Sequence, residues 1–234
     1  MIDFHTHILP EVDDGSKSYE ESLEMLKEAK NVGFDIVIST SHYAVGCYEA
    51  PEYKRKELIE DLSLEENVPQ ILLGSEIFLT YNIVELLKEF KASTINNTKY
   101  VLIELPLKKK IVNLENEINK LKENGYIPII AHPERCLYIQ KNYKVLNTLN
   151  KLGVLFQCNY GSIIGNYGFR AKYIMKKMLK DNFVSFLGTD AHRKNSIYLQ
   201  ISKAISLISK HVSTEKLVDL VNNNAEKILK GEEL

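Results

Sequence analysis

The chain begins with the stretch Met1-Ile2-Asp3-Phe4-His5-Thr6-His7, which indicates the kind of fold. Its β-branched and aromatic residues predict a short strand, and two histidines stand at the end of that strand. Because alternate side chains of a strand point to the same side, His5 and His7 can bind one ion together. The rest of the chain repeats this arrangement of an apolar strand followed by histidine or carboxylate side chains.

Seven short apolar runs alternate with segments of helical periodicity. The segments 19–29 and 114–121 show the helical pattern, with apolar residues three or four apart. Regular alternation implies parallel strands joined by right-handed crossovers, and seven such units close more easily into a barrel than they spread into an open sheet. We therefore predict one α/β domain over residues 1–234, a (β/α)7 barrel of parallel strands with outer helices. The predicted strands are residues 2–5, 36–40, 70–74, 100–105, 127–131, 154–158 and 184–188.

The bulk composition narrows the possible partners and compartments. With 30 basic and 31 acidic residues the net charge is −1, which predicts no broad attraction to nucleic acid or to an anionic membrane. Cys47, Cys136 and Cys158 are widely spaced, which argues against a disulfide framework and against thiolate zinc. The first residues lack a signal-peptide pattern, and no apolar run approaches membrane-spanning length. We therefore expect a cytoplasmic protein without membrane insertion or nucleic-acid binding.

Histidines and carboxylates stand at or just after the ends of most predicted strands. In a parallel barrel the carboxyl ends of all strands emerge on one face, so these side chains meet although they are distant in sequence. An uncompensated buried carboxylate is costly, and a bound cation is the compensation we expect here. Imidazole and carboxylate donors without thiolate suit manganese, iron or zinc better than calcium. The candidate metal ligands are His5, His7, Asp14, His42, Glu76, Glu104, His132, Asp190 and His192.

Two further aspartates flank the first ligands. Asp3 precedes His5 by two residues, so we expect it to face inward with His5 and to orient an imidazole. Asp13 alternates away from Asp14 and is predicted to be a turn residue together with Gly15.

Other polar residues near the predicted strand ends are candidates for substrate contacts. Gln157 and Asn159 share one face of their strand and could bind substrate, orient the ligands or satisfy buried backbone groups. Arg135 follows His132 closely, and its planar donor fork suits a phosphate oxygen. Lys108, Lys109 and Lys110 lie in a loop of the same face, where they could receive a phosphopeptide or simply be solvated.

These motifs together resemble the PHP (polymerase and histidinol phosphatase) superfamily, and within it the bacterial protein-tyrosine phosphatases of the CpsB/YwqE type. The resemblance covers nearly the whole chain. The histidine and acid motifs carry the superfamily, whereas Asp13-Asp14-Gly15 and the runs 132–135 and 157–162 carry the phosphatase type. The matching segments are 1–10, 13–15, 39–42, 74–77, 104–106, 131–135, 157–162 and 189–192.

The resemblance implies a distorted PHP-type barrel that binds three divalent ions, manganese in the first place, with iron or zinc as alternatives. It implies a catalytic set of Arg135, Asp190 and His192, with Arg135, Gln157 and Asn159 toward the substrate, while the proton donor stays open between His192 and a metal-bound water. The implied ligand sets are His5, His7, Glu76 and Asp190 for the first ion, Glu76, Glu104 and His132 for the second, and Asp14, His42 and His192 for the third.

The implied activity is hydrolysis of phosphotyrosine by a metal-bound hydroxide, since clustered ions lower the pKa of a bound water from ~15.7 towards ~7. The implied substrate is the tyrosine-rich tail of a bacterial tyrosine kinase that controls capsule or exopolysaccharide assembly. The main alternative is a phosphatase of a small phosphomonoester such as histidinol phosphate. A metal-dependent phosphodiesterase or nuclease is disfavoured by the near-neutral charge. A catalytically silent interaction module that keeps its ions for structure is a further alternative.

Overall fold

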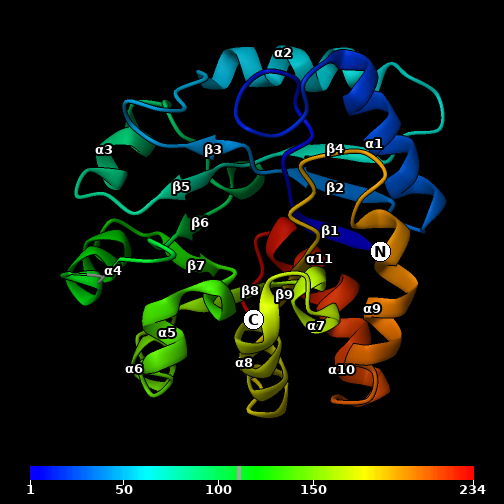
Figure 1. Ribbon diagram of the computed structural model, residues 1–234. Helices are drawn as coiled ribbons and strands as arrows, with labels where there is room; N and C mark the ends of the chain where they lie inside the picture. Colours follow the sequence, from blue (N-terminus) through cyan, green and yellow to red (C-terminus); the bar gives the residue numbers. More distant parts are fainter. Residues whose placement is uncertain (110–111) are drawn as a thin grey trace.

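The computed structural model describes residues 1–109 and 112–234, in which parallel strands alternate with helices around a curled sheet (Figure 1). The strands are β1 Ile2–Thr6, β2 Ile36–Ser39, β3 His42–Tyr43, β4 Gln70–Leu73, β5 Glu76–Phe78, β6 Tyr100–Glu104, β7 Ile127–Ala131, β8 Leu155–Asn159 and β9 Phe186–Gly188. The helices are α1 Tyr19–Asn31, α2 Glu52–Ser63, α3 Ile83–Lys88, α4 Leu114–Glu123, α5 Leu137–Lys141, α6 Val145–Lys151, α7 Tyr160–Ile164, α8 Gly168–Lys180, α9 Ile201–Ile208, α10 Thr214–Val218 and α11 Asn224–Leu229. Short turns of tighter or wider helix are η1 Ile95–Asn97, η2 Pro133–Arg135, η3 Tyr198–Gln200 and η4 Asp219–Asn223.

The strands form two parallel sheets that together make the predicted barrel. One sheet has the order β1-β2-β4 and the other the order β3-β5-β6-β7-β8-β9. The chain crosses from the first sheet to the second twice, between β2 and β3 and between β4 and β5. The ring closes where the Asp190 N–H donates to the His5 carbonyl at 2.8 Å and the His7 N–H donates to the Ala191 carbonyl at 2.9 Å. The seven predicted strands are thus confirmed, and two of them continue after a break.

The break before β5 contains a tightly packed glycine. A Cβ atom on Gly74 would lie 3.0 Å from Ile95 Cδ1 and 3.2 Å from Thr40 Cγ2, so only glycine fits without displacement. The pairing of β4 with β2 ends just before this glycine. Pairing starts again at Glu76 of β5, which lies opposite His42 of β3. The break therefore places a histidine and a glutamate side by side at the carboxyl ends of the strands.

Apolar residues fill the barrel below these polar strand ends. Within one cluster of buried side chains, Phe4 of β1 and Phe186 of β9 stack with ring centroids 4.1 Å apart. Ala225 and Ile228 of α11 belong to the same cluster. A larger cluster packs the outer faces of the strands against the surrounding helices. In the part of the chain that the structure describes, no helix is both long enough and apolar enough to cross a membrane.

Candidate metal centre

The nine candidate ligands converge at the carboxyl ends of the strands. Their donor atoms form four overlapping groups, and within each group the atoms lie within 4.8 Å of one another. Because the groups share members, the nine side chains make one continuous polar cluster. The groups are His5, His7 and Asp190; His5, Glu76 and His132; His42, Glu76 and Glu104; and His7, Asp14, His42 and His192.

The deepest group joins the end of β1 to the residues after β9. The Nε2 atoms of His5 and His7 lie 3.0 Å apart, and Asp190 Oδ1 lies 3.6 Å and 3.3 Å from them. Asp190 has a φ of 56°, and His132, which follows β7, has a φ of 30°. Both residues thus leave their strands through a left-handed turn, a conformation that is rare for residues with a side chain and is found at functional sites. That turn directs each side chain into the cluster.

Glu76 lies at the centre of the cluster and is completely buried. Its Oε1 lies 2.7 Å from His132 Nε2, and its Oε2 lies 3.0 Å from a ring nitrogen of His42. Burial would raise the pKa of this carboxyl, but His5 and His132 outweigh burial and hold the pKa well below its usual value. Oε2 receives no hydrogen bond from the described residues, although imidazole nitrogens surround it. A buried anionic oxygen without a donor suits a cation, so the residues present fit a bound metal.

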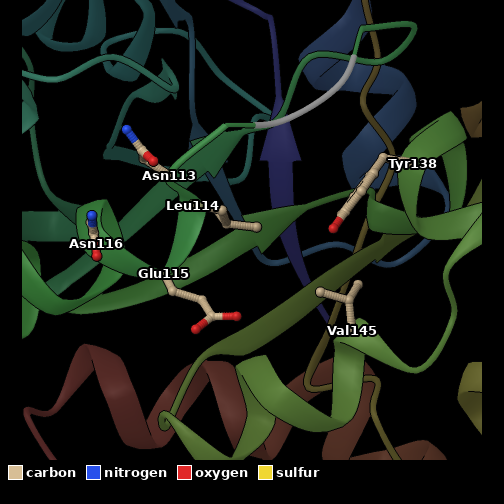
Figure 2. A pocket seen from close by; sticks show the side chains of 6 residues that line it. All are labelled: Asn113, Leu114, Glu115, Asn116, Tyr138 and Val145. Atoms are coloured by element: carbon tan, nitrogen blue, oxygen red, sulfur yellow. The ribbon is translucent and has the colours of Figure 1, made fainter.

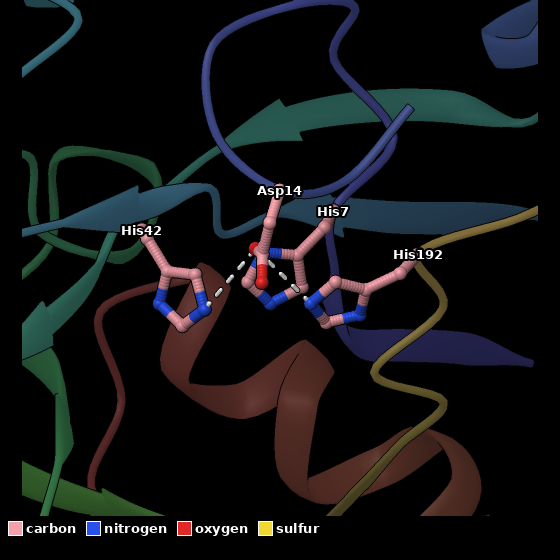
Figure 3. A group of neighbouring side chains, drawn as sticks. All are labelled: His7, Asp14, His42 and His192. Carbon is pink, nitrogen blue, oxygen red and sulfur yellow. Dashed lines mark ion pairs between the residues drawn. The ribbon is translucent and has the colours of Figure 1, made fainter. Parts of the chain in front are cut away.

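A more open group forms the rim of the cluster (Figure 3). Asp14 stands between two rings, with its Oδ1 3.6 Å from His42 Nε2 and 3.4 Å from His192 Nε2. The rings of His7 and His192 stack with centroids 4.0 Å apart. Half of the Asp14 side chain is exposed, whereas His7 is buried, so this group connects the interior of the cluster with solvent.

Further side chains fix the rings of the two β1 histidines. Asp13 Oδ2 lies 2.8 Å from His7 Nδ1 and also accepts the His42 N–H at 2.8 Å. Gln157 Oε1 lies 2.9 Å from His5 Nδ1. These contacts leave the Nε2 atom of each ring free to face the centre of the cluster. Partners of this kind set the tautomer and the orientation of metal-binding imidazoles.

The predicted role of Asp3 is wrong. Its carboxylate accepts from the Thr189 backbone at 2.8 Å, the Thr189 hydroxyl at 2.6 Å and the Tyr198 hydroxyl at 3.0 Å, and no imidazole contacts it among the described residues. The register of β1 against β2 shifts between Asp3 and Thr6, which breaks the alternation that the prediction assumed. Asp3 instead ties β1 to the segment after β9, and burial raises the pKa of its carboxyl to about 6.

Gln157 and Asn159 are completely buried and turn toward the ligands. Gln157 Nε2 donates to Asn159 Oδ1 at 2.9 Å, and Asn159 Nδ2 donates to Asp190 Oδ2 at 2.8 Å. These bonds form a chain of amides that connects His5 with Asp190. Of the predicted roles of Gln157 and Asn159, these contacts favour the orientation of the ligands. A direct contact of either residue with substrate stays a prediction.

Arg135 in η2 lies beside the deepest group. Its guanidinium donates to Asp190 Oδ2 and lies 4.2 Å from the centre of the Tyr167 ring. The side chain keeps 21% of its surface exposed, so an oxygen atom from outside the protein can reach it. Arg135 is therefore held by one ligand and one aromatic ring while it still faces solvent.

A comparison with known proteins assigns the chain to a family. Residues 1–230 match the family model described as capsular polysaccharide synthesis, CpsB/CapC. The chain belongs to the CpsB/CapC family. Its relatives include the tyrosine-protein phosphatase YwqE of Bacillus subtilis, with 31% identity over 236 residues that cover 99% of this chain and 92% of the relative. They also include the tyrosine-protein phosphatase CpsB of Streptococcus agalactiae, with 30% identity over 240 residues that cover 99% of both.

Solved structures show the same relationship. The chain is similar to a structure of YwqE from Bacillus subtilis and CpsB from Streptococcus pneumoniae, described as metal-dependent tyrosine phosphatases, with a TM-score of 0.93 and 31% identity over 100% of this chain and 96% of that chain. A histidinol phosphate phosphatase from Lactococcus lactis has a TM-score of 0.59 and 17% identity over 90% and 93%, which shows a common fold. The predicted membership of this phosphatase type is confirmed.

In this CpsB/CapC family member, Arg55 supports the cluster from α2 and was missed by the sequence reasoning. Its guanidinium is buried and donates to the Gly74 carbonyl at 2.9 Å and to the Ser75 hydroxyl. It also donates to Ser93 Oγ at 3.1 Å. These bonds hold the break that precedes Glu76. An arginine in a helix rich in charged residues gives no sequence signal that distinguishes it from a solvated one.

Two hollows border the loop after β6, and the described residues that line them include no set of metal ligands. One, of about 300 Å³, lies between the start of α4 and the α5–α6 region, and Glu115 is the one carboxylate among the described residues of its lining (Figure 2). The other, of about 150 Å³, is lined by Lys108 and Lys109 together with Tyr138 and Lys141. Lys110 lies outside the described residues. The role of the predicted lysine loop in binding phosphopeptide stays a prediction.

Proposed function

We propose that this protein is a metal-dependent protein-tyrosine phosphatase, carried by a single domain over residues 1–234. The observation that carries the proposal is the convergence of imidazole and carboxylate donors around Glu76, with the guanidinium of Arg135 beside them. The CpsB/CapC relatives support it because they are named tyrosine-protein phosphatases, and the matching solved structure is described as metal-dependent.

We assign three divalent ions to the cluster. In the first predicted ligand set, His5, His7 and Asp190 lie within one group of neighbouring donors, and the shared Glu76 lies outside that group. The third set, Asp14, His42 and His192, lies within another group. The second set differs, because Glu76 groups with His132 and His5 on one side and with Glu104 and His42 on the other. Nitrogen and oxygen donors suit manganese, iron or zinc, of which we favour manganese.

The chain's own residues prepare the site for a phosphate ester. Such ions, when bound, supply Lewis acidity and an activated water. Asp13 and Gln157 hold the rings of His7 and His5 in place, so the donors need no reorganisation. Arg135, fixed by Asp190 and stacked on Tyr167, offers its remaining N–H groups to a nonbridging phosphate oxygen. We therefore assign Arg135, Asp190 and His192 to catalysis, with His192 at the exposed rim.

Phosphotyrosine suits this site for a chemical reason. A phenolate with a pKa near ~10 leaves more readily than an alkoxide, so the ester needs little help from a general acid. No side chain is assigned as the proton donor, because His192 at the rim is already assigned to the third ion. We propose as substrate a phosphorylated tyrosine kinase tail that acts in capsule or exopolysaccharide synthesis, and the cytoplasm as the place where both proteins meet.

The test compares substrates and metals on the purified chain. We expect turnover of a phosphotyrosine peptide to be lost with chelator, to return with manganese, and to exceed turnover of histidinol phosphate. His132→Ala should lower the rate by at least ~100-fold, because it removes a ligand of the buried cluster. Asn147→Ala is the control, since Asn147 is an exposed polar residue outside the cluster. Chelator-resistant activity, or a preference for histidinol phosphate, would contradict the proposal.

A further inference from the structure

Helix α8 carries an unusual concentration of positive charge for this chain. Its sequence GFRAKYIMKKMLK contains Arg170, Lys172, Lys176, Lys177 and Lys180 and no acidic residue, although the whole chain has a net charge of −1. The buried face of the helix is apolar, so the charged side chains lie on the face that turns away from the barrel. Figure 1 shows α8, in yellow, extending away from the strands between the α5–α6 and α9–α10 regions.

The far end of α8 borders a basic groove of about 580 Å³. The groove is lined by Tyr173, Lys176, Lys177, Lys180, Asp181, Lys210 and His211. Burial first, and then Lys176 and Lys210, lower the pKa of His211, which reflects the positive potential there. The carboxylate in the groove is already engaged, because Asp181 Oδ2 accepts the Tyr143 hydroxyl at 2.9 Å.

Within residues 1–109 and 112–234, the groove lysines belong to those lysines of the chain that have no carboxylate partner. Lys30, Lys120 and Lys194 lie 2.9, 2.8 and 2.7 Å from a carboxylate oxygen. Among the described residues no carboxylate lies within ion-pair distance of the groove lysines, and Lys177 Nζ instead lies 3.8 Å from the centre of the Tyr143 ring. Several ammonium groups without a nearby carboxylate repel one another across the groove. An anionic partner bound there reduces this repulsion.

The same helix reaches the metal centre at its other end. It begins at Gly168, directly after Tyr167, whose ring stacks on Arg135. A helix of 13 residues is about 20 Å long, at ~1.5 Å per residue. A peptide extended at ~3.3 Å per residue needs roughly six to eight residues to cover that length. A phosphotyrosine at Arg135 and an acidic segment in the groove can therefore belong to one chain.

We propose that the exposed face of α8 and the basic groove dock an acidic segment of the phosphotyrosine protein, roughly six to eight residues from its phosphotyrosine. This inference rests on the proposed phosphatase function and adds the chemistry of the partner. Attraction between a basic groove and an acidic segment raises the encounter rate and the local concentration of substrate, and salt weakens both effects. The hollow shape fits the side chains of a peptide better than the plane of a membrane.

The experiment uses the metal-loaded full chain and three substrates: p-nitrophenyl phosphate, a phosphotyrosine peptide with four aspartates placed seven residues away, and the same peptide with asparagines instead. The test variant is Lys176→Glu/Lys180→Glu/Lys210→Glu. We expect it to raise KM for the acidic peptide about tenfold at low salt, to leave kcat unchanged, and to spare the other two substrates. Wild type should lose its preference for the acidic peptide in high salt.

The matched control is Lys27→Glu/Lys54→Glu/Lys227→Glu, which makes the same charge change at exposed positions outside the groove. The proposal is overturned if this control shows the same rise in KM, if acidic and asparagine peptides respond equally, or if the test variant loses only binding to phosphatidylserine vesicles. Hydrolysis of p-nitrophenyl phosphate reports on the metal centre alone. If the wild-type protein does not hydrolyse p-nitrophenyl phosphate, this result counts against the proposed phosphatase function and not against the groove.

Discussion

The Nδ1 atom of His7 lies 2.8 Å from Oδ2 of Asp13, so a carboxylate outside the ligand set fixes the most central imidazole of the cluster. Burial disfavours the charged ring, yet Asp13 outweighs burial and raises the pKa of His7 well above its usual value. The same contact lowers the pKa of Asp13 although burial opposes this change. The contact with Asp13 fixes the ring so that His7 Nε2 faces Asp190 and Glu76.

Replacing Asp13 by asparagine should weaken metal binding while the fold is kept. An asparagine side chain has the same shape but no negative charge, so the His7 ring loses the partner that sets its tautomer. We expect metal affinity to fall about 10- to 100-fold, measured by competition with a chromogenic chelator. Asp35→Asn removes an exposed carboxylate and serves as the control. Equal metal retention in both variants would show that Asp13 does not support the site.

Removing the metals should invert the pH dependence of stability. Without ions, Glu76 and Asp190 overcome burial and raise the pKa of His5, and those of His7 and His42 are raised too. A histidine with a raised folded-state pKa stabilises the fold below its unfolded pKa of ~6.5, and this contribution is lost as the pH rises through the folded-state pKa. Since burial and His7 lower the pKa of His192, that ring acts in the opposite direction.

The net expectation is that chelated protein unfolds at a higher temperature near pH ~6 than near pH ~8. Metal-loaded protein should do the reverse, because protons compete with metal for the same ring nitrogens. Thermal unfolding at both pH values, with manganese and with chelator, measures the two slopes. If the unfolding temperature changes with pH in the same direction with and without metal, protons and metal do not compete for the histidine nitrogens.

Arg135→Lys should impair catalysis although the positive charge is kept. Lysine lacks the planar fork that bonds Asp190 while offering further donors to a phosphate oxygen, and it stacks less well on Tyr167. We expect kcat/KM for a phosphotyrosine peptide to fall about 10- to 100-fold, the range for a lost charge-assisted hydrogen bond. Metal content is measured in parallel, since Asp190 is shared. Tyr167→Phe keeps the ring and should resemble wild type. If Arg135→Lys has the kcat/KM of the wild type, Arg135 does not bind the phosphate.

The sequence was sufficient for the barrel and for the convergence of the nine candidate ligands because both depend on local patterns. Most of these residues stand near the end of a predicted strand, and parallel strands bring such ends to one face. Asp3 was assigned wrongly because strict alternation was assumed, whereas the register shift in β1 turns Asp3 toward Thr189 and Tyr198. An irregularity of this kind leaves no mark in the pattern of apolar residues.

The orienting residues were harder to predict because their partners are distant or depend on a turn. Asp13 reaches back to His7 because the chain folds tightly at Gly15, where a Cβ atom would lie 2.3 Å from the His7 carbonyl oxygen. The turn was predicted correctly, but the direction of the Asp13 side chain follows from packing. Arg55 contacts Gly74 across the gap between α2 and the strands, and nothing in its own segment indicates this.

Arg55→Met should destabilise the fold and loosen the site from a distance. The guanidinium is buried, and its hydrogen bonds hold Gly74 and Ser75 just before Glu76. Methionine has a similar length but no donors, so it leaves the Gly74 carbonyl and the Ser75 and Ser93 hydroxyls without the guanidinium. Leaving buried acceptors unsatisfied costs on the order of 1–3 kcal/mol, so the midpoint of urea unfolding should fall. Metal affinity should fall as well, because Glu76 loses its fixed backbone.

The control is Lys54→Met, which changes an exposed neighbour on the same helix. If both variants unfold at the same urea concentration, the Arg55 hydrogen bonds do not stabilise the strand break.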